Sequence, residues 1–281
     1  MNLKQTRVIL TGANGGIGAA TAKELARAGA ALLLVGQPAE ALQALATELR
    51  ATGAAAWALP AELTQDAERQ RIADQARRLL GGVDVLINNA GVLDFTPFEA
   101  EDPRAIERLL QVNVVAPIAL TRAVLPQLLA QGRGRIVNIG STFGSIGFPY
   151  FAAYSASKFA LRGFSEALRR ELDGSGVGVT YIAPRATRTP LNTSAVNRMN
   201  EALKVAMDSA AAVGAAIVRA IADDRKDVYL GQPEGFFVRL NNLFPRLVDA
   251  ALRKDNGRRR KYALPEVGDL PNVSGGTMRE T

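Results

Sequence analysis

Tyr154 and Lys158 form a pair that could transfer protons in a chain without histidine. The 281-residue sequence has no histidine and no cysteine, which excludes a Ser-His-Asp triad, a cysteine nucleophile, a disulfide framework and a thiolate zinc site. Two residues four apart on a helix share one face. A phenol with a pKa of about 10 is a weak base at neutral pH, but a neighbouring ammonium lowers that pKa. The pair therefore predicts an acid–base group that works without histidine.

Ser141 and Asn113 precede this pair and add polar groups to the same chemistry. Ser141 lies thirteen residues before Tyr154, and its hydroxyl could donate a hydrogen bond to a substrate oxygen on which charge develops. Each residue alone has an ordinary interpretation, as a surface pair, a loop hydroxyl or a polar helix residue. Their joint occurrence favours catalysis over these interpretations.

A glycine-rich run follows the first expected strand and opens the first expected helix. It reads Thr11-Gly12-Ala13-Asn14-Gly15-Gly16-Ile17-Gly18. Glycines at such a turn let the backbone approach a pyrophosphate, and the helix N-terminus offers free N–H groups to phosphate. A glycine run alone could be an ordinary tight turn, but this position in the chain favours a nucleotide site.

The separate motifs fit one known pattern. The spacing Gly12-x3-Gly16-x-Gly18, the run Asn88-Asn89-Ala90-Gly91 and the Tyr154-x3-Lys158 pair resemble the short-chain dehydrogenase/reductase family, over about residues 5–232. The resemblance implies an oxidoreductase that uses NAD(P)(H), with the catalytic residues Asn113, Ser141, Tyr154 and Lys158. It also implies that the lysine holds the nicotinamide ribose and that a helix distortion at Asn113 organises a water for the proton relay. Pro117 favours a break in the helix there.

The cofactor site implied by the resemblance draws on the ends of several strands. Glu62 replaces the family's usual aspartate near the adenine, and Arg185 replaces the glycine that usually follows Pro184. Gly36 and Gln37 carry neither the acid typical of NAD-preferring members nor the arginine typical of NADP-preferring ones. Because no carboxylate would repel a 2′-phosphate, the sequence slightly favours NADP(H). The expected cofactor-binding residues are Gly12, Asn14, Gly16, Ile17, Gly18, Gln37, Glu62, Leu63, Asn89, Ala90, Gly91, Tyr154, Lys158, Pro184, Thr187 and Thr189.

Apolar side chains surround the expected position of the reacting carbonyl. The expected substrate-binding residues are Ser141, Phe143, Phe148 and Tyr154, and residues 190–208 occupy the place of the family's variable substrate lid. Such a pocket suits an apolar carbonyl or alcohol better than a sugar. Several of these side chains could instead belong to the core or to a subunit contact.

Short apolar runs alternate with longer amphipathic stretches along the chain. The runs predict strands at 7–11, 31–36, 55–59, 83–88, 135–140, 177–182 and 227–230, and their continuous apolar character is typical of parallel strands buried on both faces. Helices are predicted between them, including 16–29, 39–52, 65–80, 102–131 and 154–173. This alternation predicts a single-domain Rossmann-like α/β fold, a doubly wound parallel sheet of about seven strands with helices on both faces.

One dinucleotide-binding and catalytic domain is expected over residues 1–254, and residues 255–281 are interpreted as a basic, mobile tail. Of the net charge of +7, the segment 246–262 carries +5, from seven basic and two acidic residues. Such a segment could attract nucleic acid or an anionic membrane, but more often it is a solvated surface. It lacks interleaved aromatic residues, so nucleic acid is not expected as a partner.

Residues 234–254 are expected to form a C-terminal helical extension. Phe236, Leu240, Leu243 and Leu247 recur at helical spacing, and Pro245 is expected to interrupt the helix. The extension could pack on its own sheet, cover the substrate pocket, join subunits or lie on an anionic membrane as a peripheral contact. We expect the apolar stripe to close one side of the substrate pocket while the basic cluster stays solvated.

The sequence as a whole predicts hydride transfer between nicotinamide and the carbonyl or alcohol carbon of an apolar small molecule, with Tyr154 as acid–base. The alternative is a catalytically idle nucleotide-binding sensor or scaffold, which would not need all of Ser141, Tyr154 and Lys158. No run reaches the ~20 apolar residues of a membrane span, and the N-terminus leaves no room for a signal peptide, so a cytoplasmic protein is expected. No metal site is expected, and the resemblance implies a homodimer or homotetramer.

Overall fold

A parallel sheet of seven strands forms the centre of the protein. The computed structural model describes residues 1–231 and 233–264. The sheet has the order β3-β2-β1-β4-β5-β6-β9, and every pairing is parallel. The predicted doubly wound fold is confirmed, with strand ends within two residues of those expected. The strands are β1 (Arg7–Thr11), β2 (Ala31–Gly36), β3 (Ala56–Pro60), β4 (Val85–Asn88), β5 (Gly134–Ile139), β6 (Val177–Ala183) and β9 (Asp227–Tyr229).

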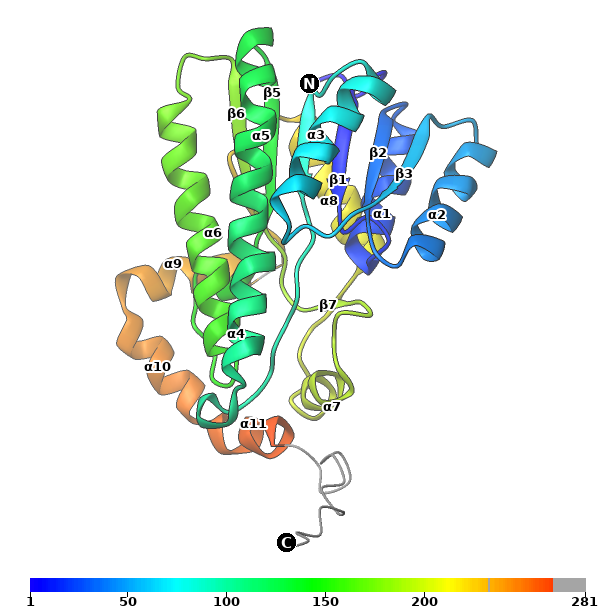
Figure 1. Cartoon of the computed structure of the whole chain (residues 1–281). Coiled ribbons are helices and arrows are strands. Elements are labelled where there is room, and N and C mark those ends of the chain that lie inside the picture. The colour runs from blue at the N-terminus through cyan, green and yellow to red at the C-terminus, as the bar shows by residue number, and fades with distance from the viewer. Residues whose placement is uncertain (232, 265–281) are drawn as a thin grey trace, which may run out of the picture.

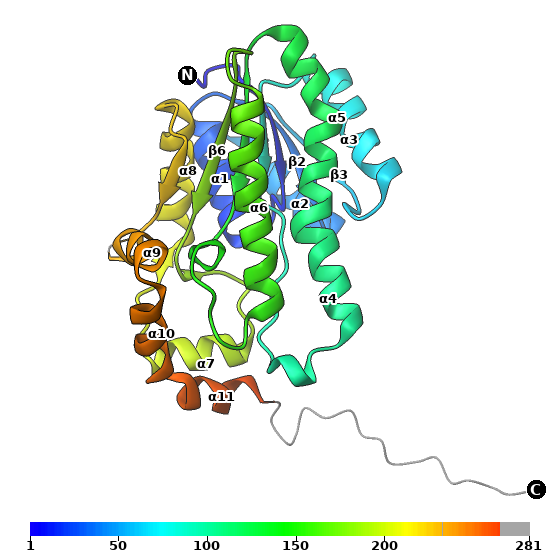
Figure 2. The ribbon, with the colours of Figure 1, turned by 90° about the vertical axis from the view of Figure 1, so that its left-hand side faces the viewer.

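Helices cover both faces of this sheet, as Figures 1 and 2 show from two sides. One face carries α1 (Gly16–Arg27), α2 (Ala39–Ala51) and α8 (Ala210–Ala222). The other carries α3 (Asp66–Leu80), α5 (Ala116–Gln131) and α6 (Ala152–Glu171). The chain changes direction along the sheet between β1 and β4, so the helices that follow these two strands pack on opposite faces of the sheet. Ligands of open α/β sheets bind in the crevice at such a switch point, outside the carboxyl ends of the strands.

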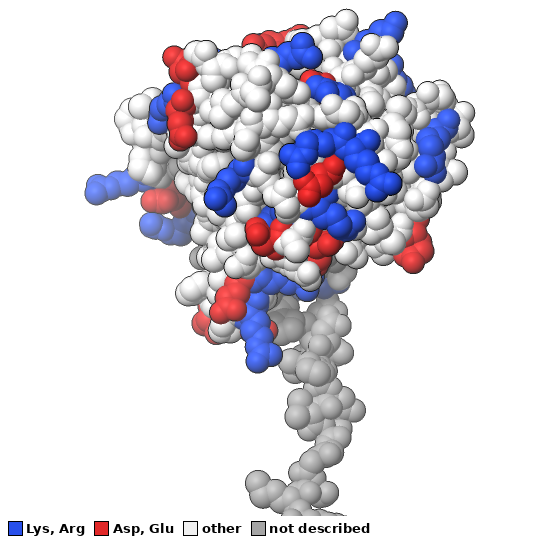
Figure 3. All heavy atoms as spheres, turned by 45° about the horizontal axis from the view of Figure 1, so that its top comes forward, with Lys and Arg blue, Asp and Glu red and all other residues white. Residues whose placement is uncertain are grey.

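Charged residues of both signs lie together at the opposite end of the sheet, where β1 begins. Figure 3 views the molecule with this end turned forward, and basic and acidic side chains are interspersed there. Arg7 donates two hydrogen bonds to Asp84, from Nε to Oδ2 over 2.8 Å and from Nη2 to Oδ1 over 2.7 Å. This bidentate pair joins the start of β1 to the turn before β4.

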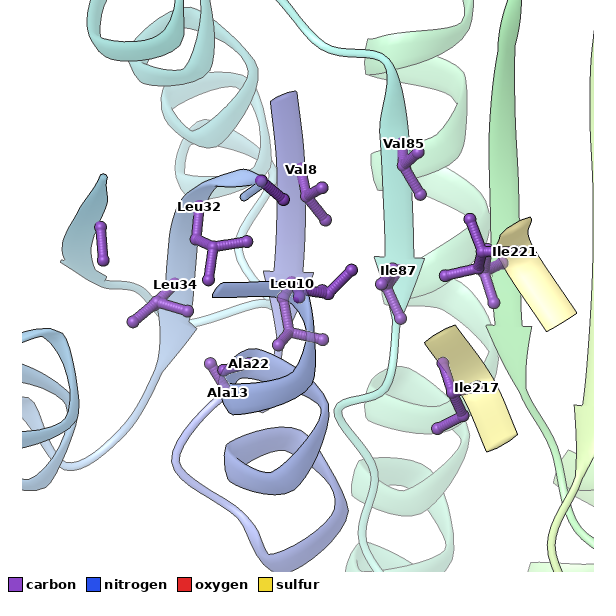
Figure 4. Packing of buried hydrophobic residues seen from close by; sticks show 14 of the residues in the cluster. Val8, Leu10, Ala13, Ala22, Leu32, Leu34, Val85, Ile87, Ile217 and Ile221 are labelled. Carbon is purple, nitrogen blue, oxygen red and sulfur yellow. The ribbon is translucent and has the colours of Figure 1, made fainter. Parts of the chain in front are cut away.

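Side chains of the central strands pack alternately in two hydrophobic cores, one on each face of the sheet. Val8 and Leu10 of β1 pack in one core, whereas Ile9 between them packs in the other. Figure 4 shows the first core, where Ile217 and Ile221 of α8 lie against the sheet. Burying a side chain of this size contributes about 1.5–3 kcal/mol. The sheet is therefore a rigid support for the loops at its carboxyl end.

The helix predicted over 102–131 contains a local distortion. It begins as α4 (Pro103–Leu110), continues as a π-helical turn (Gln111–Val115) and ends as α5. Its apolar character and length would suffice for a membrane span, but Leu120, Val124 and Leu128 are buried in the core beside the sheet. We therefore interpret it as a core helix. A π-helical turn is typical of functional sites, and this one contains Asn113.

The expected lid is a loop whose two ends are paired. The two-residue strands β7 (Thr187–Arg188) and β8 (Asp208–Ser209) pair with each other, and α7 (Ser194–Ala202) lies between them. Two 3₁₀ turns, Phe98–Ala100 and Thr142–Gly144, lie in the loops after β4 and β5. All these loops lie at the carboxyl end of the sheet (Figure 1).

The C-terminal extension consists of three helices: α9 (Glu234–Leu243), α10 (Pro245–Arg253) and α11 (Asn256–Ala263). Pro245 opens α10, so the predicted interruption lies where α9 has ended. The interpretation of residues 255–281 as a mobile tail is wrong for the described residues up to 264. Buried Ala263 and half-buried Tyr262 pack with Met199 of α7, which gives α11 a hydrophobic anchor. Residues 265–281 lie outside the described residues.

Candidate active site

Asn113 is held rigidly inside the π-helical turn. Its side chain is fully buried. The Oδ1 atom accepts a hydrogen bond from the N–H of Val92 over 2.8 Å, and Nδ2 donates to the carbonyl oxygen of Val92 over 2.9 Å. Nδ2 also lies 3.1 Å from Oγ of Ser157, on α6. Asn113 thus ties the distorted helix to the loop after β4 and to the helix that carries Tyr154.

Tyr154 lies in the first turn of α6 with its side chain buried. Phe143 and Phe151 contact its ring edge-on, with centroids 5.9 and 6.4 Å away. Burial raises the pKa of Tyr154 to about 12, and a hydrogen bond with Ser141 opposes this shift. The sequence predicted that the nearby ammonium would lower this pKa. The net direction is the opposite, because burial of the phenol outweighs the hydrogen bond with Ser141.

Lys158 lies one turn further along α6 and is also buried. Its Nζ lies 5.7 Å from the centroid of the Tyr154 ring and donates a hydrogen bond over 3.2 Å to the carbonyl oxygen of Ile139, at the end of β5. Burial lowers the pKa of Lys158 to about 8. A Cβ atom added to Gly91 would lie 3.5 Å from this Nζ and 3.2 Å from Oδ1 of Asn113. The loop after β4 therefore runs directly past both groups.

Ser141 follows β5 in an extended conformation and begins the 3₁₀ turn. Its Oγ accepts a hydrogen bond from the N–H of Phe143 over 3.1 Å. Its backbone is held by Tyr181 of β6, whose hydroxyl donates to the Ser141 carbonyl oxygen over 3.2 Å. Tyr181 is fully buried, and a Cβ on Gly140 would lie 2.2 Å from its hydroxyl. Tyr181 thus positions the segment that carries Ser141.

The glycine motif, residues 12–18, forms a tight turn in which added side chains would collide with the backbone. We call this turn the glycine cradle. A Cβ on Gly18 would lie 2.0 Å from the Gly12 carbonyl oxygen, and one on Gly12, whose φ is +60°, would lie 2.8 Å from Cα of Ala90. Asn89 donates from Nδ2 to the carbonyl oxygens of Thr11 and Gly12, over 3.0 Å each. The loop after β1 is thereby joined to the loop after β4 at the switch point. This fit of backbone to backbone is suited to a dinucleotide whose pyrophosphate approaches the N-terminus of α1.

One cavity of about 560 Å³ joins the glycine cradle to Tyr154. Cofactor and ligand sites commonly have this size. Every residue expected to bind the cofactor lines it, and so do Ser141 and Phe143. Asn113 lies behind the wall rather than in it. The structure therefore brings the expected cofactor and acid–base residues to one site.

Several cofactor-site residues are already engaged in local hydrogen bonds. Oε1 of Glu62 accepts from the N–H and the hydroxyl of Thr64, over 3.1 and 2.9 Å. The hydroxyl of Thr187 donates to the Arg185 carbonyl oxygen over 2.9 Å. Arg185 forms an ion pair of 2.7 Å with Asp208, at the far end of the lid. The unexpected arginine thus joins the loop after β6 to β8.

Phe148 does not lie in the cavity wall. Its ring stacks on Phe143 with centroids 4.2 Å apart, and the guanidinium of Arg259 lies 5.5 Å from its centroid. Arg260 forms an ion pair with Glu99 over 2.7 Å, and Arg258 donates to the Ala202 carbonyl oxygen. The expectation that the basic cluster stays solvated is wrong for Arg259, which is half-buried, whereas Arg258 and Arg260 stay exposed while making these contacts.

The apolar stripe of α9 and α10 does not close the cavity, contrary to the expectation from its sequence. Val238 and Val248 pack on Ile146, with half-buried Leu240 and Leu252 around them. None of the described residues of these two helices lines the cavity. Phe148, in the segment after β5, packs against this cluster and also stacks on Phe143, which lines the cavity. Phe151 and the lid residues Leu191, Val196 and Met199 provide the apolar wall instead.

Sequence reasoning missed three kinds of site residue. Arg108 and Val112 line the cavity from α4 and the π-helical turn. The four-residue spacing between them, which puts them on one helix face next to Asn113, is the signal that could have revealed them. Tyr181 supports Ser141 from within a strand, where it looks like an ordinary core aromatic residue. Tyr262 and Ala263 support the lid from a segment whose composition suggested a tail.

Comparisons with known proteins agree with this geometry. The family model for short chain dehydrogenases matches residues 6–200. Dehydrogenase/reductase SDR family member 7B from Bos taurus is 35% identical over 274 residues, 91% of this chain and 83% of that protein. Ketoacyl reductase HetN from Nostoc sp. is 31% identical over 226 residues, 80% of this chain and 78% of that protein.

A solved structure extends the agreement to the fold. A short chain dehydrogenase/reductase from Burkholderia phymatum in complex with NAD superposes with a TM-score of 0.81 at 26% identity, covering 88% of this chain and 96% of that one. The residues matched by the family model, 6–200, include the glycine cradle, Tyr154 and Lys158. The chain therefore belongs to the short-chain dehydrogenase family and is an oxidoreductase.

Proposed function

We propose that the protein transfers hydride between NAD(P)(H) and the carbonyl or alcohol carbon of an apolar small molecule, with Tyr154 as the acid–base. The observation that carries this proposal is the position of Tyr154 and Lys158, buried in the wall of the cavity that continues into the glycine cradle. The cofactor fits the residues present, because Gly12, Gly16 and Gly18 line the cavity without side chains. When bound, it would supply or accept the hydride.

The protein's own groups would handle the oxygen of the substrate. In the reductive direction, the Tyr154 hydroxyl donates its proton to the carbonyl oxygen while the carbonyl carbon receives hydride, which yields an alcohol and a tyrosinate. Ser141 donates a hydrogen bond to the same oxygen and stabilises its developing charge. The Lys158 ammonium favours the tyrosinate electrostatically. A phenol whose pKa is raised to about 12 begins the reaction protonated, as an acid must.

The proposal is tested by following NAD(P)H oxidation with a panel of apolar ketones and aldehydes, and NAD(P) reduction with the matching alcohols. Turnover with at least one apolar substrate is expected, and none with polar sugars. The rival function, a nucleotide-binding sensor or scaffold, predicts cofactor binding without turnover on any substrate. Calorimetric titration of the cofactor alongside the assay separates the two.

Replacement of Ser141 by alanine should lower kcat about 10²- to 10³-fold, the usual effect of removing one donor to a developing oxyanion. Cofactor affinity should change little. Ser155→Ala is the matched control, since Ser155 is a buried serine on α6 that lies outside the cavity wall. An equal loss in both variants would indicate a general disturbance of the structure around the site rather than loss of the donor.

We further propose a modest preference for NADP(H). No acidic residue stands at Gly36, and the space above it is filled by Asn14, which donates from Nδ2 to the Gln37 carbonyl oxygen over 2.8 Å. A Cβ on Gly36 would lie 2.3 Å from Oδ1 of Asn14. Asn14 therefore excludes the side chain with which relatives hold a ribose 2′-hydroxyl. The described residues of the cavity wall include three cationic ones, Arg108, Lys158 and Arg185. None of them belongs to the segment around Gly36.

Gly36→Asp alone is expected to weaken both cofactors, because the new side chain collides with Asn14. The double variant Asn14→Ala/Gly36→Asp should move the preference toward NAD(H), since the carboxylate then accepts from the 2′-hydroxyl and repels a 2′-phosphate. The ratio of kcat/KM for NADPH and NADH in the four proteins of this cycle measures the change. A strong preference of the unaltered protein for NADH would contradict the interpretation of Gly36.

We also propose that the protein works in the cytoplasm and, on the basis of the family resemblance, that it is a homodimer or homotetramer. Light scattering coupled to size-exclusion chromatography measures the assembly. A monomer across the working concentration range would contradict this part of the proposal.

A further inference from the structure

Five large apolar side chains are exposed on two consecutive helices of the C-terminal extension. The exposed fractions are 60% for Phe236, 44% for Phe237, 72% for Leu243, 56% for Phe244 and 60% for Leu247. They all belong to the twelve residues from 236 to 247, on α9, its end and the start of α10. Exposed apolar side chains gathered in this way mark an interaction surface. We call these five residues the α9–α10 surface.

The α9–α10 surface is the outer side of helices whose inner side is already anchored. Val238 of α9 and Val248 of α10 are 2% and 8% exposed and pack on Ile146. The side-chain Nδ2 of Asn241 donates to the Ser145 carbonyl oxygen over 3.0 Å, which also fixes α9 to the loop after β5. Because the inner contacts hold both helices, the outer phenylalanine and leucine side chains are left for another partner.

Four basic residues and one acidic residue accompany this surface. Arg239, Arg246, Arg253 and Lys254 are exposed, and none forms an ion pair with a described residue. Asp249 is the one acidic residue between Arg239 and Lys254. By contrast, acidic and basic side chains are interspersed at the far end of the sheet (Figure 3). The five apolar residues of the α9–α10 surface thus lie among basic residues that outnumber acidic ones four to one over residues 239–254.

We propose that the α9–α10 surface binds an anionic lipid bilayer. Short amphipathic helices with phenylalanine, leucine and basic residues lie in the membrane interface, where the rings enter the acyl boundary and the bases contact anionic headgroups. Each base near such a surface strengthens binding. The helices remain folded on the protein, so only the exposed side chains insert. The membrane contact is peripheral.

A second copy of the chain fits this surface less well. In a two-fold symmetric contact the same patch meets itself, so Arg239, Arg246, Arg253 and Lys254 of one copy would approach their equivalents in the other. Like charges facing each other at an interface are unfavourable. The same four residues are complementary to a negatively charged bilayer.

The proposed contact lies at the same end of the molecule as the cavity. Figures 1 and 2 show α11 beside the lid helix α7 at the carboxyl end of the sheet, and α10 leads directly into α11. Asn256 accepts a hydrogen bond at its carbonyl oxygen from the Tyr150 hydroxyl over 3.2 Å, which fixes the start of α11 to the loop after β5. A bilayer on the α9–α10 surface would therefore bring an apolar, membrane-dissolved substrate close to the lid.

The test is flotation of the full-length protein with vesicles of phosphatidylcholine alone or mixed with phosphatidylglycerol. We expect binding to the mixed vesicles that weakens as sodium chloride is raised, because salt screens the basic residues. Phe244→Ser/Leu247→Ser and Arg246→Glu/Arg253→Glu should each lower the partition coefficient at least ~10-fold. Turnover of a water-soluble substrate should stay unchanged, since none of these four residues lines the cavity.

Matched controls stand elsewhere on the surface. Leu129→Ser removes an exposed leucine of α5, and Arg50→Glu/Arg78→Glu reverses two exposed bases on α2 and α3. Both should bind as the unaltered protein does, and thermal melting confirms that every variant is folded. Absence of binding, equal binding to both vesicle types, or full binding by the two test variants would overturn the proposal. So would a dimer that dissociates in Phe244→Ser/Leu247→Ser, which would make this face a subunit contact.

Discussion

Tyr154→Phe should lower kcat by about 10²- to 10⁴-fold, the usual contribution of a positioned general acid. The change removes one hydroxyl and keeps the ring, whose edge contacts with Phe143 and Phe151 hold it in place. Steady-state rates of NAD(P)H oxidation measure the loss. KM for the cofactor should change little, since the phenol acts on the substrate oxygen.

Tyr150→Phe provides the matched control for this loss. Tyr150 is a neighbouring tyrosine whose hydroxyl donates to the Asn256 carbonyl oxygen and which does not line the cavity. Its replacement should leave kcat within a few-fold of that of the unaltered protein. Near-normal turnover in Tyr154→Phe would show that another group protonates the substrate oxygen. Loss of cofactor binding in that variant would instead show that the ring had moved.

Local patterns in the sequence were sufficient to predict the sheet and the cofactor cradle. The strands are continuous apolar runs buried on both faces, and the glycine motif is fixed by contacts too close for any Cβ, such as that between Gly18 and Gly12. Both properties are encoded within a few neighbouring residues. The resemblance then supplied Ser141, Tyr154 and Lys158 as one set, and the structure brings them together.

The properties that depend on packing between distant segments were not predictable from such patterns. The pKa of Tyr154 depends on how deeply Phe143 and Phe151 bury it, and the spacing of Tyr154 and Lys158 carries no information on burial. The packing partners of the C-terminal helices were not predictable for the same reason. An apolar stripe does not specify its partner, so α9 and α10 were expected against the cavity but pack on Ile146.

The basic segment that looked like a tail illustrates the same limit. Arg259 is half-buried because its guanidinium lies over the face of Phe148, 5.5 Å from the ring centroid. Arg260 forms an ion pair with Glu99, a residue 161 positions earlier in the chain. A charge run counts as solvated only when no such partners exist, and the sequence does not reveal which segments meet.

Lys158→Met should abolish most turnover and also weaken cofactor binding, because the buried ammonium serves two purposes. It stabilises the tyrosinate that forms on proton transfer, and the resemblance implies that it holds the nicotinamide ribose. Methionine fills a similar volume without charge, so the packing of α6 is preserved. We expect kcat to fall about 10²- to 10³-fold. The Kd of the cofactor should rise about 10- to 100-fold, the equivalent of one lost hydrogen bond to a charged group.

The pH dependence separates an electrostatic role of Lys158 from a structural one. Burial lowers the pKa of Lys158 to about 8. A lowered lysine pKa means that the ammonium is present below pH ~8 and is lost above it. For carbonyl reduction, kcat/KM should therefore be level below that pH and should fall about tenfold per pH unit above it. In Lys158→Met this descending limb should vanish, and the residual rate should stay level until Tyr154 itself loses its proton, near pH 12. A descending limb that persists in the variant would assign the titration to another group, and Lys158 would then only hold the ribose.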